Sequence, residues 1–85
     1  MDYRLEFTQQ AQEDLEQLPT QIIKRLLKKL DYFVHTPYPL YFAKPLTNST
    51  LGDYRFRIGD YRVIVRVHND IIYVLKIGHR REIYK

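Results

Sequence analysis

The spacing of hydrophobic positions changes along the chain, and each change marks an expected element. Residues 3–7 (YRLEF) alternate apolar and charged side chains, which predicts a strand with one buried face. Thr8 can cap a short helix over residues 9–18, because apolar residues recur there at helical spacing. A broad apolar stripe over residues 22–34 then predicts a longer helix, with Pro19 in its first turn or Thr20 as its cap.

The second half of the chain has the pattern of a β-meander. Residues 36–50 contain three prolines and no clear period, so we expect a long loop. Residues 54–58 and 61–67 alternate around a tight Gly59-Asp60 turn, and an almost wholly apolar strand follows over residues 71–77. The order β-α-α-β-β-β predicts an α+β fold in which two helices cover one face of an antiparallel sheet.

Length and composition favour one small domain spanning residues 1–85. The chain has 85 residues, of which 45% are hydrophobic, and this is ordinary globular composition. It has no cysteine, no apolar run of the roughly 20 residues that cross a bilayer, and no signal-peptide pattern in MDYRLEFTQQ. We therefore expect a cytoplasmic protein that does not contact membranes and that gains stability from a partner.

The positive charge lies entirely in the second half of the chain. Residues 43–85 carry nine Lys/Arg against four Asp/Glu, a net charge of +5, whereas residues 1–42 carry five against six. This asymmetry indicates a polyanionic partner, either a nucleic acid or an acidic protein segment.

Many of these cations are expected on one face of the sheet. Because successive side chains of a strand point to opposite faces, the arginines of residues 54–58 and 61–67 can share the face that the helices leave open, where we expect Arg62 to be exposed. Residues 78–84 then add further basic groups at the end of the sheet. A planar guanidinium suits phosphate, although from charge alone a purely solubilising role is an equal alternative.

Several segments of the sequence resemble those of a known protein family. LGDYRFRIGDYRVIVRV, VLKIGHRREIYK, the opening YRLEFTQQAQEDLEQLP and a KPL segment are similar to the RelE-like branch of the RelE/ParE superfamily of toxins. The resemblance implies a compact α+β toxin, similar to microbial ribonucleases, that enters the ribosomal A site and cleaves mRNA. It also implies an acidic, RelB-like antitoxin that neutralises the toxin and alone connects it with operator DNA.

The resemblance assigns roles to residues by position. The family's basic residues correspond to Arg55, Arg57, Arg62 and Arg80, and its C-terminal tyrosine corresponds to Tyr84. Arg55, Arg57 and His79 stand where the best-studied members carry lysines. Charge stabilisation is expected from Arg57, Arg62 and Arg80, and a proton-transfer role from Tyr84 or His79. Further RNA contacts are expected from Arg55, Arg66, Arg81 and Lys44.

Other kinds of site are disfavoured. The three histidines are far apart in sequence and lack ligands at metal spacing, and no glycine-rich phosphate loop is present, so we expect neither a metal nor a cofactor. Two rival functions stay open: a ParE-like inhibitor of DNA gyrase without catalysis, and an inactive member that acts as co-repressor with its antitoxin. The complete set of basic residues and Tyr84 favours the nuclease.

Overall fold

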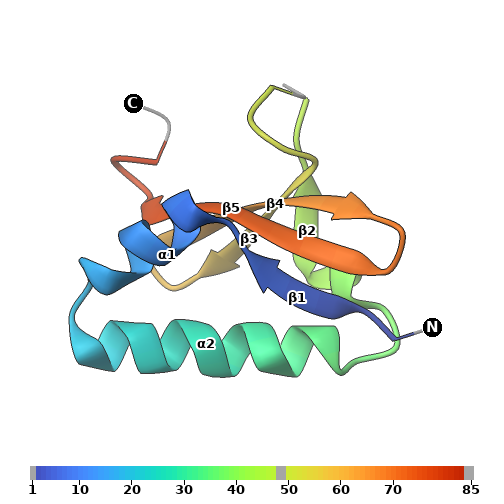
Figure 1. Cartoon of the computed structure of the whole chain (residues 1–85), viewed down its shortest axis with the longest axis horizontal. Helices are drawn as coiled ribbons and strands as arrows, with labels where there is room; N and C mark the ends of the chain where they lie inside the picture. Colours follow the sequence, from blue (N-terminus) through green and yellow to red (C-terminus); the bar gives the residue numbers. More distant parts are fainter. Residues whose placement is uncertain (1, 48–49, 84–85) are drawn as a thin grey trace.

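The computed structural model describes residues 2–47 and 50–83, and it folds as two helices on one side of a five-stranded sheet (Figure 1). The sheet has the strand order β1-β5-β4-β3-β2. In chain order the elements are β1 (Arg4–Phe7), α1 (Gln9–Glu16), α2 (Thr20–Val34), the 3-10 helix η1 (Pro39–Phe42), β2 (Ala43–Pro45), β3 (Tyr54–Ile58), β4 (Tyr61–His68) and β5 (Ile71–His79).

The helix starts follow from local chemistry. Thr8 caps α1 as predicted, and its hydroxyl oxygen accepts a 3.2 Å hydrogen bond from the backbone N–H of Ala11. In α2, Thr20 is the first helical residue and Pro19 occupies the N-cap position. The Pro19 carbonyl accepts hydrogen bonds from the N–H groups of Ile22 and Ile23, so the proline ends the preceding turn and begins the longer helix.

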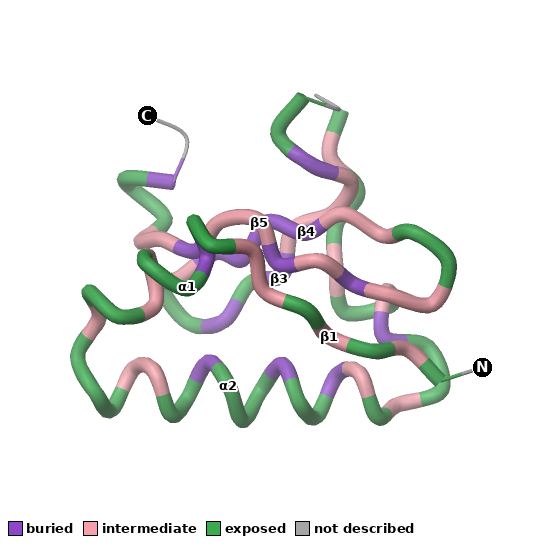
Figure 2. The backbone as a smooth tube through the Cα atoms, in the orientation of Figure 1, coloured by how far each residue is buried: buried purple, intermediate pink, exposed green. Residues whose placement is uncertain are grey.

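The main core lies between α2 and the sheet. The inner side of α2 is buried where it faces the strands, and its outer side is exposed (Figure 2). Leu26, Leu30 and Phe33 of α2 pack on the helix-facing side of the sheet, and the Phe33 ring stacks on Phe56 of β3 at 5.1 Å between ring centroids. The predicted apolar stripe of α2 therefore forms the core, although Leu27 at its edge is 38% exposed.

The α+β fold and its element order are confirmed, with two differences in the sheet. Residues 43–45 form the short edge strand β2 within the segment predicted as a loop. In addition, β1 pairs with β5 in parallel, so the sheet is mixed and only the pairs among β2, β3, β4 and β5 are antiparallel. The helices carry the chain from β1, at one edge of the sheet, to β2 at the other edge.

None of the described helices is long and apolar enough to cross a membrane.

Candidate nucleic-acid interface

The side of the sheet that faces away from α2 carries two rows of basic residues. In an antiparallel pair, residues in register point to the same face. One row is formed by Arg57 and Arg62, which are in register across β3 and β4. We call this side of β3, β4 and β5 the basic face.

The Arg57–Arg62 pair stands at the end of the hairpin whose two-residue turn is Gly59-Asp60. Gly59 has φ +60°, a conformation that glycine adopts without strain and that a hairpin turn of this kind requires. Like charges directly opposite each other in a sheet repel and reduce stability. A bound anion between these two arginines would remove that repulsion.

Arg62 differs from the expectation of an exposed phosphate ligand. Its side chain is buried, with 7% relative exposure, and Nη1 donates hydrogen bonds to the carbonyls of Gly59 at 3.0 Å and Tyr61 at 2.9 Å. The expectation was wrong because the guanidinium folds back on the turn of its own hairpin. These bonds fix the position of the Arg62 charge, whereas Arg57 beside it is exposed.

A second row crosses four strands. Lys44 of β2 is in register with Arg55 of β3, Arg55 with Ile64 of β4, and Ile64 with Lys76 of β5. The structure thus brings Lys44 and Arg55 together on the basic face, which the sequence predicted for Arg55 and not for Lys44. Lys76 was not singled out from the sequence.

Lys76 reaches the basic face because of a β-bulge. The register between β4 and β5 shifts after Ile64, since Ile64 pairs with Lys76 while Val65 pairs with Val74, so Leu75 is an extra residue. If residues 74–76 alternated regularly, without a bulge, Lys76 would point into the core on the same side as Val74. A lysine two positions after a buried valine, followed at once by the apolar Ile77, was the signal in the sequence that could have predicted the bulge.

Two segments pack on the basic face, each against a residue in register with one of the two rows. The loop before β3 approaches so closely that a Cβ atom on Gly52 would lie 2.7 Å from Cγ2 of Ile64. At the other end, the turn after β5 folds back, and a Cβ atom on Gly78 would lie 3.1 Å from Cδ1 of Ile83. Both segments stand on the side of the sheet away from α2 (Figure 1). Gly52 and Ile83 are buried.

Two of the predicted phosphate ligands are held by carboxylates. Arg66 lies 3.8 Å from Asp53, whose other carboxylate oxygen accepts a hydrogen bond from the Val67 N–H. Arg80 lies 3.8 Å from the Asp60 side chain and also donates its backbone N–H to the Asp60 carbonyl at 2.7 Å. Exposed pairs at such distances contribute little stability, so they orient the arginines and still permit exchange for a phosphate.

The structure does not bring His79 to the basic face. His79 is in register with Tyr61, which packs against the main core, and the two rings contact edge to face at 5.6 Å between centroids. Its Nδ1 accepts a hydrogen bond from the Arg81 N–H at 3.2 Å. His79 therefore lies on the helix side of the sheet edge. Arg81 is exposed in the turn that follows, and Tyr84 lies outside the described residues.

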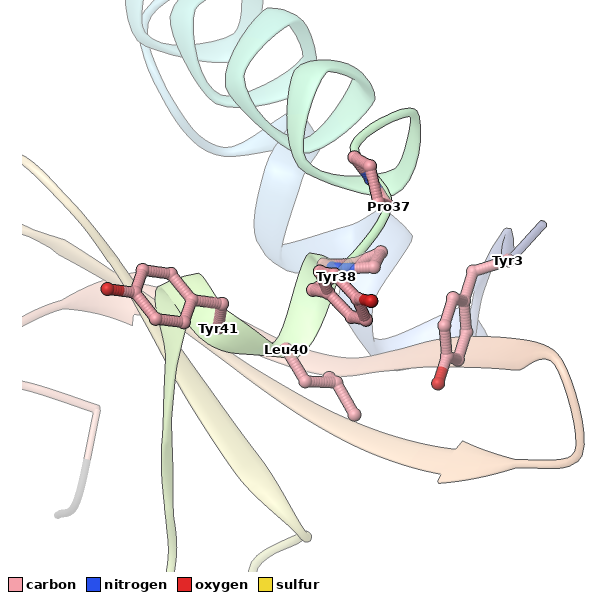
Figure 3. Close-up of a pocket in the computed structure, with 6 residues that line it drawn as sticks. Tyr3, Pro37, Tyr38, Leu40 and Tyr41 are labelled. Carbon is pink, nitrogen blue, oxygen red and sulfur yellow. The ribbon is translucent and has the colours of Figure 1, made fainter. Parts of the chain in front are cut away.

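A sizeable hollow of the described surface lies away from the basic residues. A cavity of about 480 Å³ is lined by Tyr3 and by residues 37–41, between the end of α2 and the start of β1. Tyr38 and Tyr41 are 78% and 85% exposed, and Tyr3 lies across from Tyr38 (Figure 3). None of the predicted site residues lines this cavity.

Among the described residues, no group of three His, Asp or Glu side chains could hold a metal ion.

Comparison with known proteins decides the family. The family model described as the ParE toxin of a type II toxin–antitoxin system matches residues 5–84. This chain belongs to the RelE/ParE toxin superfamily. The toxin is 30% identical to toxin RelG of Mycobacterium tuberculosis, over the whole of this chain and 99% of RelG. The resemblance that the sequence indicated is thereby confirmed.

Solved structures agree with this assignment of the toxin. The RelBE2 toxin–antitoxin complex of M. tuberculosis contains a chain that is 28% identical, with a TM-score of 0.77 over 94% of this toxin and all of that chain. The archaeal RelE–RelB complex from Pyrococcus horikoshii gives 33% identity and a TM-score of 0.74, over 96% of this toxin and 99% of that chain. The protein is thus a RelE-like toxin of a type II toxin–antitoxin system.

Proposed function

We propose that this toxin is an endoribonuclease that enters the ribosomal A site in the cytoplasm and cleaves mRNA without a metal ion. The observation that carries the proposal is the Arg57–Arg62 pair on the basic face, the side of the sheet away from α2. Two cations held opposite each other are unfavourable in the free protein and become favourable when a phosphate lies between them. Fixed cations of this kind stabilise the charge that develops during phosphoryl transfer.

The chemistry needs only the RNA and these side chains. The 2′-oxygen attacks the adjacent phosphorus, the bond to the 5′-oxygen breaks, and the products are a 2′,3′-cyclic phosphate and a 5′-hydroxyl. One proton leaves the 2′-hydroxyl and one is delivered to the departing 5′-oxygen. Arg57, Arg62 and Arg80 stabilise the negative charge on the phosphoryl oxygens, and Arg55, Arg66, Arg81 and Lys44 hold the flanking strand.

Proton transfer is assigned to Tyr84 in this proposal. His79 was the second candidate, but its place beside Tyr61 separates it from the arginine pair. Arginine is effectively always protonated, so none of the arginines is a suitable base. A positioned acid or base contributes roughly 10²- to 10⁴-fold to the rate, which sets the size of the effect expected for Tyr84→Phe.

The proposed partner is an acidic, RelB-like antitoxin. The M. tuberculosis and P. horikoshii relatives are in complexes with RelB proteins, and the exposed basic face of this toxin is complementary to acidic side chains. Bound acids would neutralise part of the basic face, and operator DNA would be reached only through the antitoxin.

The association of the antitoxin with the toxin should slow as salt is added, because steering between opposite charges is screened over about 8–10 Å. A rate that does not change with salt would contradict this assignment.

The basic face also favours the nuclease over the two rival functions. A gyrase inhibitor without catalysis does not need a pair of cations that can hold a phosphate, and an inactive co-repressor does not need one either. Both rivals predict that growth arrest, if it occurs, leaves messages intact.

The proposed function is tested by primer extension on a defined message in a translating extract. The toxin should produce new 5′ ends within codons, only when ribosomes are engaged on the message. Arg57→Ala should produce none, and Lys24→Gln, on the outer side of α2, should cut like the wild type. Intact message in the presence of folded wild-type toxin would contradict the proposal.

A further inference from the structure

We propose that Lys76 is a phosphate-binding residue of the basic face, which holds the RNA strand one nucleotide away from the phosphate bound at the Arg57–Arg62 pair. The inference rests on the proposed function and adds to it a residue that neither the sequence pattern nor the family resemblance singled out. It is carried by the strand register, by the bulge at Leu75, and by the surroundings of Lys76.

The register places Lys76 beside the arginine pair. Arg62 is in register with Gly78, and Lys76 precedes Gly78 by two residues on β5, so both point to the same face. Two residues of a strand span about 6.7 Å, which is comparable with the step between successive phosphates of an extended RNA strand. An RNA strand whose cleaved phosphate lies at the Arg57–Arg62 pair can therefore place a neighbouring phosphate at Lys76.

The two segments that pack on the basic face leave Lys76 between them. Ile83 packs on Gly78 on one side, and on the other the loop at Gly52 packs on Ile64 and Leu75. A bound RNA strand is thereby confined to the part of β5 that carries Lys76. Lys76 itself is only half-buried, so its ammonium group can meet a ligand.

Lys76 also differs from the other half-buried cations in its partners. Arg66 has a carboxylate 3.8 Å away, as does the more exposed Arg80. The Lys76 side chain forms no hydrogen bond and no ion pair with any residue in the ranges 2–47 and 50–83. A charge that is partly removed from water and lacks an acidic neighbour is costly unless an anion binds it. The bulge that exposes Lys76 on this face is therefore best explained by a ligand with negative charge.

The test measures binding separately from cleavage. The probe is a fluorescent single-stranded RNA in which every 2′-hydroxyl is methylated, so that it binds without being cut. Its affinity is measured by anisotropy over a series of salt concentrations for the wild type, Lys76→Gln, Lys76→Met, Lys76→Arg and Lys24→Gln. The Met variant retains the apolar stem of the half-buried side chain, and urea unfolding checks that each variant is folded.

We expect Lys76→Gln and Lys76→Met to weaken binding by about three- to tenfold and to reduce the slope of log K against log salt by about 0.7, the value for one lost phosphate contact on a single strand. Lys76→Arg should retain both, and Lys24→Gln should match the wild type. In ribosome-dependent cleavage, KM should rise while kcat stays within about twofold, because the contact is made equally in the ground state and the transition state.

Two outcomes would overturn the inference in different ways. If the wild type binds the probe and both neutral Lys76 variants bind it as Lys24→Gln does, Lys76 is not a phosphate ligand while the proposed function is unaffected. If the wild type neither binds the probe nor cuts the message, the proposed function fails and this inference fails with it.

Discussion

Arg57 and Arg62 lie directly opposite each other across the β3–β4 hairpin, but one guanidinium is exposed and the other is buried against the turn. The buried member is held by two backbone carbonyls. The pair therefore combines a fixed charge with an accessible one. Because of this difference, we expect substitution of Arg57 to affect activity alone and substitution of Arg62 to affect both activity and stability.

Arg57→Ala should abolish cleavage and leave stability nearly unchanged. The side chain is exposed, so its loss should shift the free energy of unfolding by no more than about 0.5 kcal/mol, and relief of like-charge repulsion acts in the stabilising direction. Urea unfolding and primer extension measure the two effects. Arg4→Ala, on the exposed side of β1, is the matched control. Normal cleavage by a folded Arg57→Ala protein would remove Arg57 from the site.

Arg62→Ala should reduce cleavage and also destabilise the fold. Its removal leaves the carbonyls of Gly59 and Tyr61 without these donors, and the loss of a buried, charged hydrogen-bonding group costs about 1–3 kcal/mol. The measurement is the urea midpoint compared with that of Arg57→Ala. Equal midpoints for the two variants would show that the bonds of Arg62 to the turn do not support the hairpin.

His79→Gln should leave the cleavage rate within about threefold of the wild type. Its ring lies against Tyr61 on the helix side of the sheet edge, away from the cation pair. Single-turnover rates across pH 5.5–8.5 provide the measurement, with Tyr84→Phe as the comparison. A loss of the roughly 10²-fold or more that a general acid or base supplies would return His79 to the catalytic set.

Gly78→Val should impair cleavage through the C-terminal turn. A Cβ atom at this position already meets Ile83 at 3.1 Å, so the larger valine should displace the turn that carries Arg80 and Arg81. We expect a reduction in cleavage of at least tenfold, with a smaller relative change in the urea midpoint. Thr47→Ser, at an exposed loop residue, is the control variant that leaves this turn in place. Full activity of Gly78→Val would show that the position of the turn does not matter.

The sequence predicted the parts of the fold that have a long regular period. The alternation in β3 and β4 placed Arg55, Arg57 and Arg62 on the correct face, and Thr8 correctly marked the start of α1. In contrast, β2 has only three residues and ends in Pro45, so no period was available to distinguish it from a loop.

The errors at the site have a common physical origin in single-residue events. One extra residue at Leu75 moves Lys76 to the basic face, and the same shift in the alternation places His79 on the helix side, in phase with Ile77. The burial of Arg62 depends on a side-chain conformation that folds over the turn. A regular period does not predict the side-chain conformation of Arg62, and the bulge leaves only a local break in the alternation, at Lys76 and Ile77.

The most direct test of the central claim is the effect of a single missing 2′-hydroxyl on cleavage of a message bound in the ribosomal A site. The message carries one 2′-deoxynucleotide, placed in turn at each position of the A-site codon, and the ends of the products are identified by mass spectrometry. We predict that substitution on the 5′ side of the cut abolishes cleavage, and that the unsubstituted message yields a 2′,3′-cyclic phosphate and a 5′-hydroxyl. Continued cutting at the deoxy position, or products with a 5′-phosphate, would contradict the account.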